Sequence, residues 1–139
     1  MEIQRIAYKK LLEWKGSPNH KPLIIQGARQ VGKTWLIKHF GNKEFESMAY
    51  FNFDENAELM QFFNATKDVH RILRNLTMVH GKPIIPGKTL LVFDEIQECP
   101  EALNALKYFN ENAAEYDIIC AGSLLGVYNT PPKLDRVNS

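Results

Sequence analysis

The sequence predicts an α/β fold, a three-layer sandwich in which helices cover both faces of a mostly parallel sheet. Helix-like and strand-like hydrophobic patterns alternate along the 139 residues, without repeats or low-complexity segments. The segments 89–93 and 118–121 are almost continuously apolar, as strands buried on both faces usually are. A glycine-rich loop connects the strand expected at 23–26 to a helix. The apolar content of 45% suits one globular domain of this length.

The other elements follow in order from the same periodicity and from the residues that interrupt it. Apolar residues on one face predict a first helix that ends before Gly16. The helix after the glycine-rich loop is expected to end at Gly41-Asn42, which suits a left-handed C-cap. The segment 54–56 is typical of a helix N-cap. The remaining expected elements are strands at 48–53, 89–93 and 118–121, and helices at 57–63, 69–79 and from Pro100 onward.

The glycine-rich loop is a complete phosphate-binding (Walker A) pattern. Gly27 to Thr34 read G-A-R-Q-V-G-K-T, which matches G-x-x-x-x-G-K-[ST] between a strand and a helix. The backbone N–H groups of such a loop converge on one point, and the helix N-terminus adds a positive dipole end. We therefore expect a nucleoside triphosphate, with Lys33 neutralising its β- and γ-phosphates. The expected binding residues are Gly27, Ala28, Arg29, Gln30, Val31, Gly32, Lys33, Thr34 and Trp35.

An acidic pair, Asp94-Glu95, ends the apolar segment 89–93 and forms a Walker B pattern. In such sites the hydroxyl of the loop threonine, here Thr34, binds Mg²⁺ directly and the first carboxylate usually binds it through water. Glu95 would then be the catalytic base that orients the attacking water and accepts its proton. The alternative for Glu95 is a carboxylate that only caps a helix.

A third polar position, Ser123, follows the strand expected at 118–121. In P-loop ATPases with an extra strand between the two Walker strands, this strand ends beside the attacking water. Ser123 is therefore a candidate sensor of the γ-phosphate. The candidate catalytic residues are Glu95, Lys33 and Ser123. A serine satisfied within a tight glycine turn is the alternative.

Four sequence blocks together resemble the prokaryotic AAA-type ATPase family, in the branch that carries a downstream domain of unknown function, DUF4143. The blocks are G-A-R-Q-V-G-K-T, Y-F-N-F-D-E-N, L-L-V-F-D-E-I-Q-E-C-P and I-I-C-A-G-S-L-L-G. The resemblance covers about residues 5–127. It implies an ASCE P-loop sheet of strand order 5-1-4-3-2, ATP and Mg²⁺ as ligands, and ATP hydrolysis. It also places Gln97 near the γ-phosphate, where a plain amide at a helix start is the alternative.

The family's fifth strand, helical lid and second domain have no recognisable counterpart after Val127. We therefore expect residues 1–127 to be an incomplete ATPase core and residues 128–139, which contain Pro131-Pro132, to be a loop or disordered tail. The first strand would then be a sheet edge, and an exposed edge favours self-association.

Turnover is expected to be slow or absent, because hydrolysis generally needs an arginine at the γ-phosphate. The candidates are Arg29, Arg71 and Arg74, each of which a surface position explains equally well or better.

Charge and cysteine content limit the setting. A net charge of +1 is too balanced to indicate nucleic-acid binding. Two cysteines favour a protein of the reducing cytoplasm over a scaffold held by disulfides. No apolar run approaches the roughly 20 residues of a membrane span. The four histidines share no metal spacing and are assigned no role. The aromatic residues at 50–53 and 62–63 are expected in the core.

Two classes of function remain open. One is an ATPase that converts hydrolysis into motion of an attached module, and the other is a nucleotide-gated module that switches without appreciable turnover. A third, a small-molecule kinase, would need a second substrate pocket and phosphate-clamping arginines. Adenine is preferred over guanine because of the resemblance and because the sequence lacks an N-K-x-D guanine motif.

Overall fold

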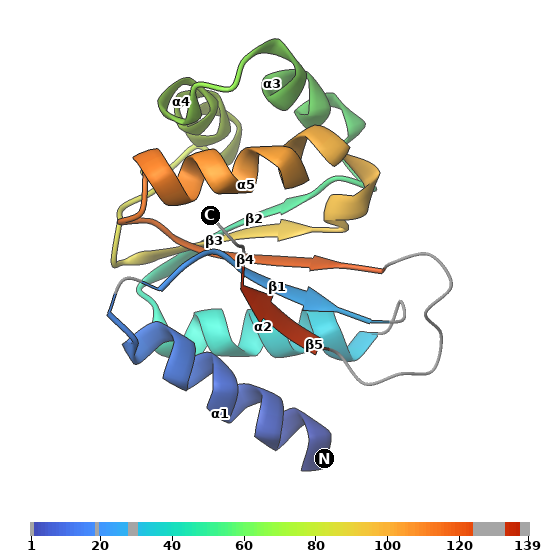
Figure 1. The fold of residues 1–139 in the computed structure, drawn as a ribbon, viewed down its shortest axis with the longest axis vertical. Coiled ribbons are helices and arrows are strands. Elements are labelled where there is room, and N and C mark those ends of the chain that lie inside the picture. The colour runs from blue at the N-terminus through green and yellow to red at the C-terminus, as the bar shows by residue number, and fades with distance from the viewer. Residues whose placement is uncertain (1, 19, 28–30, 124–132, 137–139) are drawn as a thin grey trace.

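A five-stranded sheet of order β2-β3-β4-β1-β5 forms the centre of the computed structural model, which describes residues 2–18, 20–27, 31–123 and 133–136 (Figure 1). Neighbouring strands among β1 to β4 are parallel, and β5 runs antiparallel to β1. The expected α/β class is confirmed, and so is the order 1-4-3-2 of the four parallel strands. The strands are β1 (Leu23–Gln26), β2 (Ser47–Asn52), β3 (Thr89–Asp94), β4 (Asp117–Gly122) and β5 (Lys133–Arg136).

Helices cover both faces of the sheet, as the alternating pattern predicts. Figure 1 shows one group of helices below the sheet and another above it. The lower pair is α1 (Glu2–Gly16) and α2 (Val31–Glu44). The upper group is α3 (Met60–Ala65), α4 (Val69–His80) and α5 (Pro100–Asn112), with 3₁₀ turns at Ala57–Leu59 and Ile96–Glu98.

The side chains of β3 explain why its sequence is continuously apolar. Leu91 and Phe93 pack into the core under α3, α4 and α5, whereas Leu90 and Val92 pack into the core against α1 and α2. Successive strand residues point to opposite faces, so a strand covered on both faces buries every side chain. Phe93, which is fully buried, contacts the rings of four other phenylalanines: Phe51, Phe53, Phe63 and Phe109.

The prediction that the first strand is a sheet edge is wrong. β5 pairs along the outer side of β1, with Leu23 opposite Arg136 and Gln26 opposite Lys133. The segment expected to be a tail therefore contains a strand at 133–136, while 128–132 and 137–139 lie outside the described residues. Sequence periodicity missed β5 because a short antiparallel edge strand needs no apolar run; its backbone groups make the pairing.

One expected helix boundary is wrong, and one expected N-cap lacks its side-chain hydrogen bond. Gly41 does not end α2, which continues to Glu44, and a Cβ at Gly41 would lie 2.6 Å from Met48 Sδ. The glycine is there because strand β2 approaches the helix closely, not because the helix stops. Asn56 precedes the turn at 57–59 without a side-chain cap; instead Asn52 Oδ1 accepts from the backbone N–H of Asp54 at 2.9 Å.

His20, which was assigned no role, connects the segment before β1 to the start of β4. Its Nε2 contacts the Asp117 carboxylate, and its Nδ1 lies 3.0 Å from the backbone oxygen of Ser17. The His20 ring also packs on the edge of Trp14, which is buried. This contact fixes how α1 leads into the strand that carries the phosphate loop.

The carboxyl ends of the parallel strands and the N-terminus of α2 lie at one edge of the sheet, at the right of Figure 1. Parallel strands in an open α/β sheet deliver the residues after them to the same edge, which is where ligands bind in such folds. The three sequence patterns singled out above begin at or directly after the carboxyl ends of β1, β3 and β4.

Candidate functional site

The ammonium of Lys33 is the central group of the site. Its side chain is only 4% exposed, and it reaches from the first turn of α2 to the carboxyl ends of β1 and β4. Nζ donates to the backbone oxygen of Gly27 at 3.1 Å, to that of Gly122 at 3.0 Å and to Ser123 Oγ at 3.3 Å. A buried charge must be matched by polar partners, and these oxygens supply them. Two of the predicted catalytic residues, Lys33 and Ser123, are thus in direct contact.

The phosphate loop begins at Gly27, whose φ of 154° is readily adopted only by glycine. This residue turns the chain out of β1. At the other end of the loop, α2 begins at Val31. Gly32, Lys33 and Thr34 therefore belong to the first helical turn, whose N–H groups have no partner within the helix and form the positive end of its dipole.

The two residues expected to bind Mg²⁺ are hydrogen-bonded to each other. The Thr34 hydroxyl donates to Asp94 Oδ2 at 3.0 Å, which joins the first turn of α2 to the end of β3. Asp94 is only 4% exposed, and its other oxygen, Oδ1, accepts the backbone N–H of Glu95 at 2.9 Å. Both predicted ligands therefore present oxygen atoms at one point, and oxygen is what Mg²⁺ prefers.

Tyr50 is a site residue that the sequence did not single out, because it was expected only in the core. Its hydroxyl donates to Asp94 Oδ2, the oxygen that Thr34 also contacts, and the Lys38 ammonium lies 4.4 Å from its ring centroid. Burial and the contact with Asp94 raise the pKa of Tyr50, which keeps it a hydrogen-bond donor. The register of β2 against β3, with Asn52 opposite Asp94, is the signal that brings Tyr50 there.

Glu95 has an unusual backbone. Its φ and ψ of 53° and 45° place it in the left-handed region, the only non-glycine residue there among those that the structure describes. Such a conformation costs on the order of 1 kcal/mol and often occurs at functional sites. It turns the chain between the end of β3 and the 3₁₀ turn Ile96–Glu98.

Gln97 connects Glu95 to the end of β4. Its Nε2 donates to Glu95 Oε1 at 3.3 Å, and its Oε1 accepts the backbone N–H of Ser123 at 3.2 Å. The prediction that the Gln97 amide could bond neighbouring backbone in this region is confirmed, and its placement near the γ-phosphate stays a prediction.

The model of the AAA domain family matches residues 19–132, which include every candidate site residue from Gly27 to Ser123. The chain belongs to the AAA domain family. No curated protein matches it. The predicted resemblance to an AAA-type ATPase is therefore confirmed, and membership of the AAA family indicates a nucleotide-binding ATPase. The association with a DUF4143 domain stays a prediction.

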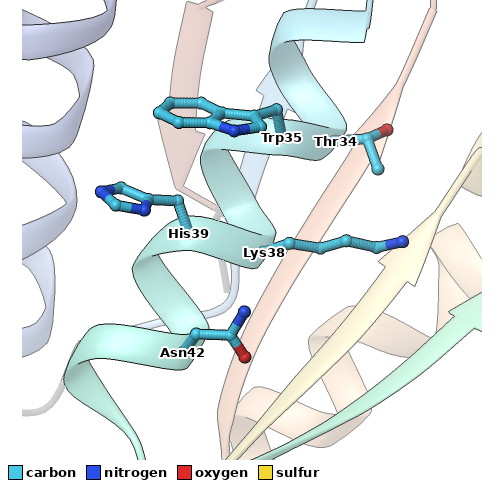
Figure 2. Close-up of a pocket in the computed structure, with 5 residues that line it drawn as sticks. All are labelled: Thr34, Trp35, Lys38, His39 and Asn42. Atoms are coloured by element: carbon cyan, nitrogen blue, oxygen red, sulfur yellow. The ribbon is translucent and has the colours of Figure 1, made fainter.

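A shallow pocket lies along α2 of this AAA domain, next to the phosphate loop. It has a volume of about 500 Å³ and is lined by Thr34, Trp35, Lys38, His39 and Asn42 (Figure 2). Trp35 is 49% exposed and stacks on His39, with ring centroids 4.7 Å apart. In Figure 2 these two rings extend to one side of the helix and Lys38 extends to the other. The nucleotide-binding role predicted for Trp35 is untested.

Some predicted residues fall outside what can be described. Three of the predicted binding residues, Ala28, Arg29 and Gln30, lie outside the described residues. The arginine-finger role considered for Arg29 therefore stays a prediction. Arg71 and Arg74 are exposed on α4. Within the described ranges, no group of three or more histidine, cysteine or acidic side chains could hold a metal ion, and no helix is long and apolar enough to cross a membrane.

Proposed function

We propose that this AAA domain binds ATP together with Mg²⁺ and hydrolyses the terminal phosphate. The observation that carries the proposal is the 3.0 Å hydrogen bond between Thr34 Oγ1 and Asp94 Oδ2. It brings the two Walker patterns, which are far apart in the sequence, to one point beside the buried Lys33 ammonium. A helix N-terminus, a cation and two oxygen ligands at one sheet edge are the set of groups that a magnesium nucleotide requires.

The donor set fits Mg²⁺ rather than a transition metal. A hydroxyl and a carboxylate are hard oxygen ligands, and Mg²⁺ is usually held by one or two protein groups together with substrate phosphates and water. The lack of a cluster of three acidic, histidine or cysteine side chains among the described residues is compatible with such a partial site. Thr34 and Asp94 would hold the Mg²⁺, which when bound would neutralise negative charge on the phosphates.

The remaining roles follow from chemistry and position. Lys33 exchanges backbone oxygens for the β- and γ-phosphate oxygens and stabilises the negative charge on them. Glu95 accepts the proton of the attacking water, which makes the water a better nucleophile. Ser123 contacts Lys33 at 3.3 Å and reports on the γ-phosphate through that contact.

Binding and hydrolysis are tested separately. Titration of the chain with ATP, GTP and ADP, with and without Mg²⁺, is expected to show ATP binding that Mg²⁺ strengthens. Phosphate release is then followed with enzyme in excess over ATP, so that a slow single turnover is measured. Binding of ATP with no phosphate release would support the alternative function, a nucleotide-gated switch without appreciable turnover.

Two variants assign the roles. Lys33→Ala is expected to abolish ATP binding, whereas Lys43→Ala, in the exposed last turn of the same helix, should bind as the wild type does. Glu95→Gln is expected to bind ATP normally and to lower the single-turnover rate by about 10²- to 10⁴-fold, the usual contribution of a general base. The matched control is Glu98→Gln, an exposed residue of the same turn. A Glu95→Gln rate equal to that of the wild type would show that Glu95 is not the base.

A further inference from the structure

We propose that Gln97 is a positioning residue, which holds the Glu95 carboxylate to the end of β4 and so couples it to the phosphate-sensing segment Gly122-Ser123. This inference rests on the proposed hydrolytic function, because it assigns to Gln97 control over the orientation of the base. Gln97 itself touches neither substrate nor metal in this assignment. It acts through Glu95.

The nitrogen and the oxygen of the Gln97 side-chain amide connect Glu95 to Ser123. The Gln97 NH₂ group donates to Glu95 Oε1 at 3.3 Å, and its carbonyl oxygen accepts the Ser123 N–H at 3.2 Å. A side-chain amide is uncharged, and it donates and accepts at once with a fixed geometry. A carboxylate in its place would still accept from Ser123 but would repel Glu95.

Gly122 provides an independent observation. A Cβ at this position would lie 2.6 Å from Gln97 Oε1 and 3.4 Å from Ile96 Cγ2, so the absence of a side chain is what lets the amide reach Ser123. Gly122 is the last residue of β4. Gly122, the first glycine of the third sequence pattern, is thereby explained by the close approach of Gln97.

The opposite side of the same segment is held by Lys33. Its ammonium donates to the Gly122 backbone oxygen at 3.0 Å and to Ser123 Oγ at 3.3 Å. Gly122-Ser123 is thus bonded to the phosphate-binding lysine on one side and to Gln97 on the other. A phosphate that draws the ammonium away from these oxygens changes the position of Ser123, and the Gln97 amide transmits that change to Glu95.

The backbone of Glu95 makes this coupling effective. Its left-handed conformation is uncommon for a residue with a side chain, so tertiary contacts must hold it there. The Asp94 carboxylate accepts its N–H, and Gln97 holds its carboxylate. Loss of the Gln97 contact therefore removes a hydrogen bond that sets the direction of the Glu95 carboxylate.

Two variants of Gln97 separate the two bonds. Gln97→Glu keeps the acceptor for Ser123 and removes the donor to Glu95, whereas Gln97→Met has a similar length and removes both. We expect both to lower the single-turnover rate of ATP hydrolysis about 10- to 100-fold, the usual effect of losing a group that orients a reactive side chain. The dissociation constant for ATP should change by less than about threefold, because binding rests on Lys33 and the loop.

Gly122→Ala tests the close approach. It displaces the Gln97 amide without changing it, so its rate should fall as in Gln97→Met. In the Gln97→Ala background the added methyl has no amide to meet, and the double variant should be no slower than Gln97→Ala alone. Independent, multiplying losses would contradict the proposal, since they would mean that the two residues act separately.

A measurement without nucleotide distinguishes failure of this inference from failure of the proposed function. Exchange of the Ser123 amide hydrogen, followed by NMR, should be faster in Gln97→Met and Gly122→Ala than in the wild type, but not in Gln97→Glu. Unchanged exchange in Gln97→Met, or a normal hydrolysis rate in Gln97→Glu, would overturn the positioning role. Failure of the wild type to bind ATP would instead refute the proposed function, with the Ser123 exchange still deciding whether the bridge exists.

Discussion

At the scale of single residues, the site contains buried polar groups that are each hydrogen-bonded to several partners. Lys33 and Asp94 are each only 4% exposed. Lys33 donates to Gly27, Gly122 and Ser123. Asp94 accepts from Thr34, from Tyr50 on β2 and from the backbone N–H of Glu95. A buried charged group without such partners would cost several kcal/mol, so these contacts stabilise the fold and prepare the site together.

Tyr50→Phe tests the residue that sequence patterns missed. The variant keeps the ring and removes the hydroxyl that donates to Asp94 Oδ2. We expect the free energy of unfolding to fall by about 1.5 kcal/mol, which is the lower end of what a hydrogen bond to a charged acceptor contributes. The Mg²⁺ concentration that half-maximally supports ATP binding should rise about tenfold, because Tyr50 orients a carboxylate expected to bind the metal.

Tyr116→Phe is the matched control, because Tyr116 is a partly buried tyrosine in the turn before β4, away from Asp94. Its Mg²⁺ dependence should equal that of the wild type. An identical Mg²⁺ response in Tyr50→Phe would limit Tyr50 to a structural role.

At the scale of elements, β5 changes the interpretation of the C-terminal segment. It pairs antiparallel with β1, the strand that leads into the phosphate loop. β1 is thereby hydrogen-bonded on both sides, to β4 and to β5. Pairing on both sides removes the open row of backbone N–H and C=O groups that would otherwise favour association with another chain.

Deletion of residues 133–139 is expected to restore the exposed edge that the sequence alone predicts. The free energy of unfolding should fall by several kcal/mol, because four residues of strand pairing are lost and each backbone hydrogen bond contributes about 1 kcal/mol. Analytical ultracentrifugation should show self-association that increases with protein concentration. Deletion of residues 137–139 alone leaves the β5 pairs in place and serves as the control. A full deletion that stays monomeric and equally stable would show that β5 does not protect β1.

At the scale of the whole molecule, the two faces of the sheet bury separate apolar clusters. The cluster above the sheet contains five buried phenylalanines, and the cluster below contains Trp14 and residues of α1 and α2. Both cysteines belong to the upper cluster, and burial raises the pKa of the thiols of Cys99 and Cys120. The folded core therefore keeps these thiols protonated.

This burial predicts a loss of stability at alkaline pH. A thiol whose pKa is raised by folding binds its proton more tightly in the folded state, so its contribution is fully present below the ordinary thiol pKa. The contribution is lost as the pH rises above that value, because only the unfolded chain then ionises. For Cys120, the free energy of unfolding should fall by about 1.4 kcal/mol at one pH unit above the unfolded pKa of about 8.5.

Urea unfolding between pH 7.5 and 9.5, with a reducing agent present, measures this loss. Cys120→Ala should show a smaller decrease over the same range, whatever its stability at pH 7.5, while Cys99 still contributes in both proteins. The same pH dependence in wild type and variant would assign the effect to other groups.

Local patterns sufficed for much of the fold. The expected strands at 48–53, 89–93 and 118–121 lie within one residue of β2, β3 and β4. β3 and β4 are recognisable because strands covered on both faces need unbroken apolar segments. Boundaries set by tertiary contact were missed: Gly41 is required by the approach of Met48, and β5 depends on pairing rather than on its own side chains. Nothing in a local window distinguishes these cases.

The sequence by itself determined the phosphate loop, the acidic pair and the α/β class, because each depends on neighbouring residues or on periodicity. Only the tertiary structure decided which groups meet. The contacts of Lys33 with Ser123, Tyr50 with Asp94, and Gln97 with Ser123 join segments that are far apart in the sequence. The physical reason is the parallel sheet: its register brings residues that are distant along the chain to one edge, and hydrogen bonds between buried polar groups then select their partners.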